Sequence, residues 1–192
     1  MKKFADRAKA NGLKNIHVME KRHATIWGAA SLLSMYLDAV KCALEEMGWL
    51  NWDFILNLSE TDFPLLSLQE LEYHLARNKG YNFLSSHGYD TARFIQKQGL
   101  EYVFFECESR MWRLGKRLEL YSIRFDGGSD WLVLSRDFAQ FALTNDALVR
   151  SLREMFANIL LPVESFFHTV RQYRASASPY FSVVKVLSKM TI

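Results

Sequence analysis

Two glycines followed by a serine, an aspartate and a tryptophan form the first group whose residue types could do chemistry. This turn is Gly127-Gly128-Ser129-Asp130-Trp131. Glycines let a backbone approach a ligand closely, Asp130 offers an acceptor for hydroxyl groups, and Trp131 offers a flat apolar face. That combination is typical of sugar-binding sites. A structural glycine turn with a core tryptophan is the alternative, and the residues alone favour it because short motifs have low specificity.

Glu164 is a second candidate because it is an acid in an otherwise apolar stretch, 160–167. Burial there would raise its pKa and make it usable as a general base. The alternative is an acid in the first turn of a helix that simply complements the helix dipole. Taken alone, Glu164 fits that structural alternative better.

A third candidate is the junction Thr25–Ser31, where small residues lead into a predicted helix. The N-terminus of a helix can face phosphate groups. The spacing, however, matches neither a P-loop nor a dinucleotide fingerprint, so the indication is slight.

Other common chemistries find little support. The histidines, at 17, 23, 74, 87 and 168, form no helical pair, so no metal site is expected. Cys42 and Cys107 permit at most one internal disulfide and cannot form a zinc site by themselves. Cys107 also lies between two glutamates, a poor setting for a reactive thiolate, and no Gly-x-Ser-x-Gly elbow occurs.

Composition limits the class of protein. The chain has 192 residues, 49% of them hydrophobic and 23% charged, which suits one domain with a sizeable core and excludes disorder. Lys and Arg total 24 against 21 Asp and Glu, a net charge of +3 that is spread along the chain and does not indicate a nucleic-acid partner. No apolar run is long enough to span a membrane, and the basic start lacks the apolar run of a signal peptide.

Hydrophobic periodicity predicts the elements that must position these residues. Strands are predicted at 15–23, 52–58, 81–84, 102–106, 118–125 and 131–134. Helices are predicted at 29–47, 67–77, 137–143, 146–159 and 163–171. A capping box at Ser67–Glu70 opens the second helix, Asn145 caps the fourth, and Pro162 suits the start of the last. Alternating strands and helices predict a layered α/β domain with a mixed sheet, whose ligand would lie beside the loops 57–64 and 126–131.

Several stretches, taken in order, resemble the peptide O-xylosyltransferases. These belong to the larger family that includes the core-2 and I-branching β-1,6-N-acetylglucosaminyltransferases. The matching stretches are 24–33, 52–64, 82–88, 92–100, 111–115, 126–131 and 160–170, and together they cover about 15–172. The pair Asp130-Trp131 after Gly-Gly-Ser favours the xylosyl branch of the family.

The resemblance implies a GT-A type domain of a Golgi type II membrane enzyme. Such an enzyme moves xylose from UDP-xylose to serines of proteoglycan core proteins, which starts heparan and chondroitin sulfate chains, and it needs no metal ion. The transfer inverts the anomeric carbon, so a single base must take the serine proton.

The resemblance also assigns roles to residues of this sequence. Glu164 matches the base, and Asp130 an acidic residue facing the xylose and the acceptor. Thr25 and Trp27 match residues that line the donor site, and Gly128, Ser129 and Trp131 complete the predicted substrate site.

The sequence also departs from the family pattern. It begins within the nucleotide-binding portion, lacks the membrane anchor, and lacks the adjacent Arg and Lys that grip the diphosphate. Residues 1–172 are therefore predicted to be a GT-A domain truncated at both ends, with 173–192 as a divergent tail. Two alternatives stay open: an inactive truncated product that binds a partner or nothing, and an enzyme that uses UDP-N-acetylglucosamine.

Overall fold

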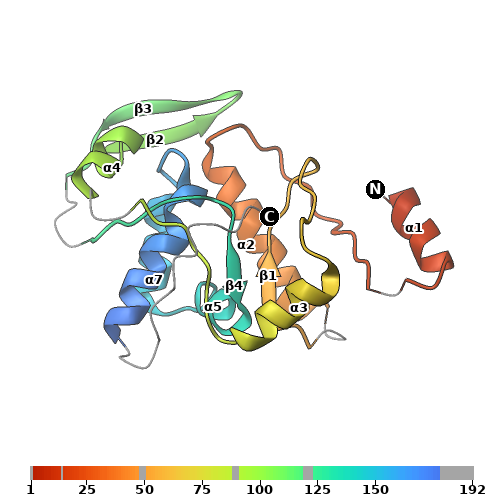
Figure 1. Cartoon of the computed structure of the whole chain (residues 1–192). Helices are drawn as coiled ribbons and strands as arrows, with labels where there is room; N and C mark the ends of the chain where they lie inside the picture. The colour runs from red at the N-terminus through yellow and green to blue at the C-terminus, as the bar shows by residue number, and fades with distance from the viewer. Residues whose placement is uncertain (1, 14, 48–50, 88–90, 119–122, 178–192) are drawn as a thin grey trace.

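Helices make up most of the regular structure. The computed structural model describes residues 2–13, 15–47, 51–87, 91–118 and 123–177. Figure 1 shows its elements in chain order: helices α1 (Lys2–Ala10), α2 (Ala30–Glu45), α3 (Leu68–Arg77), α4 (Thr91–Gln98), α5 (Arg136–Phe141), α6 (Ala147–Phe156) and α7 (Phe166–Ala177), the 3₁₀ turn η1 (Pro162–Glu164), and strands β1 (Phe54–Leu56), β2 (Tyr102–Cys107), β3 (Arg110–Lys116) and β4 (Val133–Ser135).

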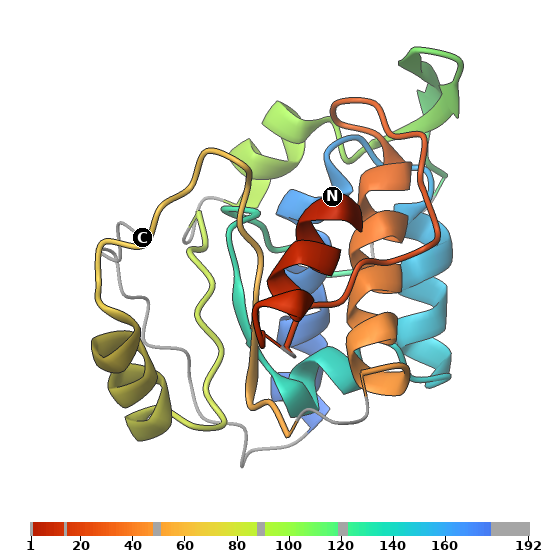
Figure 2. The ribbon, with the colours of Figure 1, turned by 90° about the vertical axis from the view of Figure 1, so that its right-hand side faces the viewer.

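The strands form two small antiparallel sheets. β1 pairs with β4, with Ile55 opposite Leu134, and an isolated bridge adds Phe83 beside Val133. β2 and β3 form a hairpin that projects at one end of the molecule, as Figures 1 and 2 both show. The α/β class is therefore confirmed, but the predicted mixed sheet is wrong for the described residues, whose strand pairs are all antiparallel. A tight hairpin can only be antiparallel, and a parallel pair would need a long crossover connection.

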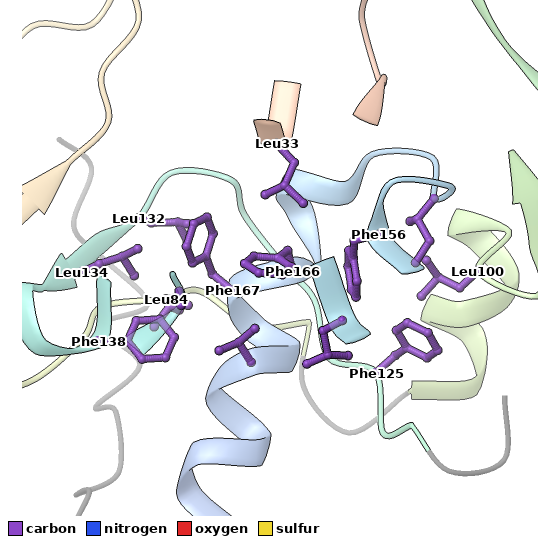
Figure 3. Close-up of a cluster of buried hydrophobic side chains, with 14 residues drawn as sticks. Leu33, Leu84, Leu100, Phe125, Leu132, Leu134, Phe138, Phe156, Phe166 and Phe167 are labelled. Atoms are coloured by element: carbon purple, nitrogen blue, oxygen red, sulfur yellow. The ribbon is translucent and has the colours of Figure 1, made fainter. Parts of the chain in front are cut away.

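The core lies between the β1–β4 pair and helices α2, α6 and α7. Figure 3 shows Leu33, Phe156, Phe166 and Phe167 converging there, all nearly or fully buried. Phe166 meets the rings of Phe156 and Phe167 nearly edge-on, with centroids 5.3 and 5.1 Å away, the geometry that aromatic rings prefer. Because α7 begins with two buried phenylalanines, its first turn is fixed against the core directly after Glu164.

The predicted helices are largely confirmed, and some of their ends are corrected. The capping box of α3 is present, with Ser67 and Glu70 bonding each other's backbone amides. The predicted cap Asn145 is wrong: Asp146 caps α6, accepting hydrogen bonds from two amides of its first turn. The last predicted helix is divided, because η1 ends at Glu164 and α7 begins only at Phe166.

Fewer of the predicted strands are confirmed. No strand forms at 15–23, whose alternating residues find no partner strand to pair with. At 81–84 there is only the bridge at Phe83. Half of the prediction at 118–125 falls on 119–122, outside the described residues, and 123–125 is not a strand.

Candidate functional site

The turn 127–131 and Glu164 meet through the main chain. The amide of Gly128 donates a hydrogen bond to the carbonyl oxygen of Glu164 at 2.8 Å. Glu164 ends η1, which follows Leu161, a residue in the left-handed conformation with φ of 52°. The two candidates singled out in the sequence as a possible sugar cradle and a possible base therefore lie side by side.

Close packing around Gly128 explains why a glycine occupies this position. A Cβ atom there would lie 1.8 Å from the carbonyl oxygen of Ser85 and 2.9 Å from Cε1 of His168. On either side, Ser129 donates to the Ser85 carbonyl at 2.9 Å and the Gly127 carbonyl accepts from the His87 amide at 2.8 Å. The turn is thus fixed against residues 85–87 and has no room for a side chain at position 128.

His168 supports the same turn from α7, four residues after Glu164. Its ring is fully buried and its Nε2 lies 2.9 Å from the carbonyl oxygen of Ser129. Burial lowers the pKa of His168, so the ring is neutral near pH 7. A carbonyl can only accept, so Nε2 carries the proton and donates it to this hydrogen bond.

Asp126 anchors the beginning of the turn through a buried hydrogen-bond network. Its carboxylate accepts from Ser86 at 2.8 Å, Arg171 at 3.0 Å and Gln172 at 3.1 Å. Burial acts to raise the pKa of Asp126, but the hydrogen bonds from these three side chains together hold it below its ordinary value. Asp126 is therefore an ionised structural residue beside the site.

The electrostatic setting of Glu164 suits a base. Its pKa is raised, first by burial and then by the negative charge of Asp130. His87, Lys97 and a hydrogen bond from the side chain of Gln98 act in the opposite direction. The carboxylate is half-buried, so it is both partly desolvated and reachable. A carboxylate with a raised pKa takes a proton from a hydroxyl group more readily.

Asn57 holds Asp130 and Trp131 at the end of β1. Its side-chain amide donates to the Asp130 carbonyl at 2.9 Å, and its side-chain oxygen accepts from the Leu132 amide at 2.8 Å. Trp131 is 48% exposed, so the alternative interpretation as a core tryptophan is wrong. The predicted polar loop after β1 and the turn before β4 are thus joined.

The segment Thr25–Gly28 reaches the same region through its backbone. The carbonyl of Gly28 accepts a hydrogen bond from the Leu161 amide at 2.8 Å, three residues before Glu164. Thr25 is half-buried, whereas the ring of Trp27 is 83% exposed and contributes nothing to the core. The Trp27 ring is therefore accessible to a ligand.

The start of α2 already has a negatively charged partner. Glu106 from β2 accepts from the Ser31 amide at 2.9 Å and from the Ser31 hydroxyl at 2.6 Å. The N-cap residue of α2, Ala29, offers no side-chain cap. The hypothesis that this helix N-terminus faces phosphates is therefore not supported, because a carboxylate of the same chain satisfies it.

Several residues around the site were not identified from the sequence: Ser86, Gln98, Glu106 and His168 act on it only through tertiary contacts. Asp126 belongs to the predicted loop 126–131, but its role as an anchor was not predicted. One signal was available for Gln98, a polar residue three positions after the half-buried Ile95 of the amphipathic α4. In the predicted helix 163–171, His168 follows Glu164 by four residues, a spacing that would place both side chains on one face, but the structure divides that helix between η1 and α7.

Both cysteines have free thiols. Cys42 is buried and Cys107 is exposed, so the single disulfide that the sequence permitted is not formed. Among the described residues, no helix combines the length and the apolar character needed to cross a bilayer.

Comparison with known proteins identifies the family. The sequence model of the Core-2/I-Branching enzyme family matches residues 1–189. Xylosyltransferase sqv-6 of Caenorhabditis elegans is 48% identical over 161 residues, which are 84% of this chain and 20% of that protein. Xylosyltransferase 2 of Homo sapiens is 52% identical over 162 residues, 84% of this chain and 19% of that protein. The chain spans about a fifth of the length of these relatives. This chain belongs to the Core-2/I-branching enzyme family.

Proposed function

We propose that this chain is part of the catalytic domain of a GT-A type xylosyltransferase. The proposed reaction transfers xylose from UDP-xylose to a serine hydroxyl of a proteoglycan core protein, with inversion at the anomeric carbon. Support comes from relatives named xylosyltransferases that are about half identical to it. Residues 1–172 are the proposed partial domain and 173–192 a proposed divergent tail.

The observation that carries the proposal is the hydrogen bond from the Gly128 amide to the Glu164 carbonyl. This bond joins the main chain of Glu164 to the turn that bears Asp130, and the charge of Asp130 acts on the Glu164 carboxylate. In the proposed step, the serine oxygen forms a bond to the anomeric carbon while Glu164 takes its proton. The bond from that carbon to the diphosphate oxygen breaks, and UDP leaves with the electron pair. No metal ion is assigned a part in this step.

The neighbouring residues have proposed roles that follow from their positions. The Asp130 carboxylate would accept hydrogen bonds from sugar or acceptor hydroxyls. Its charge also raises the pKa of Glu164 and makes it a stronger base. The exposed rings of Trp27 and Trp131 would cover apolar faces of the donor, with Thr25, Gly128 and Ser129 lining the space between them.

The test is xylose transfer from UDP-xylose to a peptide containing Ser-Gly, measured as UDP release and as product mass. Glu164→Gln should lower kcat by about 10²–10⁴-fold, the usual contribution of a positioned base. Glu154→Gln is the matched control: this residue is exposed on α6 and 4.0 Å from Arg150, and its loss should leave the rate unchanged. Equal rates for Glu164→Gln and the parent chain would contradict the proposed base.

The same assay separates the alternatives. If UDP-N-acetylglucosamine is the preferred donor, the chain is an N-acetylglucosaminyltransferase of the same family. A chain that neither transfers xylose nor gains thermal stability at saturating UDP-xylose would be an inactive product. The proposed location is the lumenal side of the Golgi membrane.

A further inference from the structure

Three side chains of different chemistry converge at the end of α2 away from Glu164. Cys42 and Glu46 lie one helical turn apart, and His17 approaches them from the segment that precedes α2. One imidazole nitrogen, one sulfur and one carboxylate oxygen all lie within 4.8 Å of one another. Sulfur, nitrogen and oxygen donors in this combination are ligands that Zn²⁺ accepts.

The separations are close to those of a bound tetrahedral ion. Zinc bond lengths place neighbouring sulfur and oxygen ligands about 3.6 Å apart, and nitrogen and oxygen ligands about 3.4 Å apart. The Sγ of Cys42 lies 3.5 Å from Oε2 of Glu46, and Nε2 of His17 lies 4.0 Å from the same oxygen. The contact between His17 and Glu46 must shorten by about 0.6 Å, and a side-chain rotation of His17 can bring its ring closer to both other ligands.

The thiol is buried yet accessible to a small ion. Cys42 is 6% exposed, but it lines a cavity of about 650 Å³, together with His17, Glu46 and residues of α1. Lysines and acids both line this cavity, so binding would depend on the three ligands rather than on a general negative field. The thiol proton now directed at Glu46 occupies the place where a metal ion would bind.

We propose that His17, Cys42 and Glu46 form a three-ligand Zn²⁺ site whose fourth position is taken by water. Cys42 would lose its proton and bind as the thiolate, and the ion would tie the segment around His17 to the last turns of α2. The site lies about 16 Å along the axis of α2 from Ser31, at the rise of 1.5 Å per residue. It is therefore separate from the proposed transfer reaction, and its test does not depend on that reaction.

The experiment is a titration of the metal-free chain with Co²⁺, a spectroscopic substitute for zinc, in the presence of a phosphine reductant that keeps both thiols free. Thiolate coordination produces a charge-transfer absorption band, and saturation is expected at one Co²⁺ per chain. Zinc should then displace the cobalt. Cys42→Ser should abolish the band, and Cys107→Ser, which changes the other and exposed thiol, should retain it.

A second variant removes any dependence on the folding of a core mutant. His17→Gln changes a side chain outside the core and should weaken Co²⁺ and Zn²⁺ binding at least tenfold, measured by competition with a chromophoric chelator. Zinc should also raise the Tm of the parent chain and not that of Cys42→Ser. The proposal is overturned if no charge-transfer band forms, if the band survives in Cys42→Ser, or if His17→Gln binds as tightly as the parent.

Discussion

The side-chain amide of Gln98 donates a hydrogen bond to Oε2 of Glu164. Gln98 is the last residue of α4 and is 6% exposed, whereas Glu164 is the last residue of η1. A neutral donor that bonds a carboxylate favours its ionised form and fixes its orientation. Gln98 is thus a positioning residue for the proposed base.

Replacing Gln98 by methionine tests this relationship. Without the donated hydrogen bond, the pKa of Glu164 should rise further, so a smaller fraction of the base is ionised at mildly acidic pH. The acidic limb of the kcat/KM profile should move to higher pH, and the rate at pH 6 should fall about three- to tenfold.

Glutamine 96 provides the control for that profile. Gln96 lies on the exposed face of the same helix, and Gln96→Met should leave the acidic limb unmoved. An acidic limb at the same pH in Gln98→Met and the parent chain would show that the hydrogen bond does not tune Glu164.

Gly128→Ala should severely destabilise the fold. The new Cβ would lie 1.8 Å from the Ser85 carbonyl oxygen. This atom belongs to the backbone, which cannot move away as easily as the end of a flexible side chain. We expect a loss of more than about 3 kcal/mol, seen as a fall in Tm of roughly 6–12 °C for a chain of this size. Gly115→Ala is the matched control, because no atom lies within 4 Å of a Cβ built there. Equal Tm values for the two variants would refute the close packing.

Local signals predicted the elements of this fold better than they predicted its contacts. The spacing of Leu33 and Val40 on one face indicated α2, and Ser67 with Glu70 marked the start of α3, because both features depend on neighbours three to seven residues away. β3 was missed because six of its seven residues are exposed, so no burial pattern marks it. The strand predicted at 15–23 was wrong for the opposite reason: its apolar and polar residues alternate, but no other strand among the described residues pairs with it.

In the candidate site too, individual residues could be predicted from the sequence but their contacts could not. Glu164 and Asp130 could be singled out by residue type and family resemblance. Their juxtaposition could not, because it depends on a hydrogen bond between Gly128 and Glu164 across 36 residues of sequence. Gln98 and His168 act on the site from still other elements. Nothing in the sequence near either residue specifies the partner that the fold brings to it.

The buried His168 should make the free energy of unfolding depend on pH below about 6.5. Its pKa is lowered in the folded protein by burial, while an unfolded histidine titrates near 6.5. As pH falls below about 6.5, the unfolded chain binds a proton that the folded chain does not. The free energy of unfolding should then fall with decreasing pH, by at most about 1.4 kcal/mol per pH unit, until the folded pKa is reached.

Chemical denaturation between pH 7.5 and 5 measures this slope. In His168→Gln the glutamine amide can still donate to the Ser129 carbonyl, but it does not titrate, so the slope should be lost. The metal-free His17→Gln chain should keep it, because His168 is unchanged there. A parent chain whose stability is flat across this range would contradict a neutral, buried His168.

Trp27→Ala should separate binding from stability. The ring is 83% exposed, so its removal should change the free energy of unfolding by no more than about 0.5 kcal/mol. Its loop is joined to η1 by the hydrogen bond between Gly28 and Leu161, which places it beside the proposed donor site. Affinity for UDP-xylose, measured by calorimetry, should fall about tenfold, or about 1.4 kcal/mol. Trp112→Ala removes a ring that is 49% exposed on the hairpin and should leave that affinity unchanged; the same loss in both variants would place Trp27 outside the donor site.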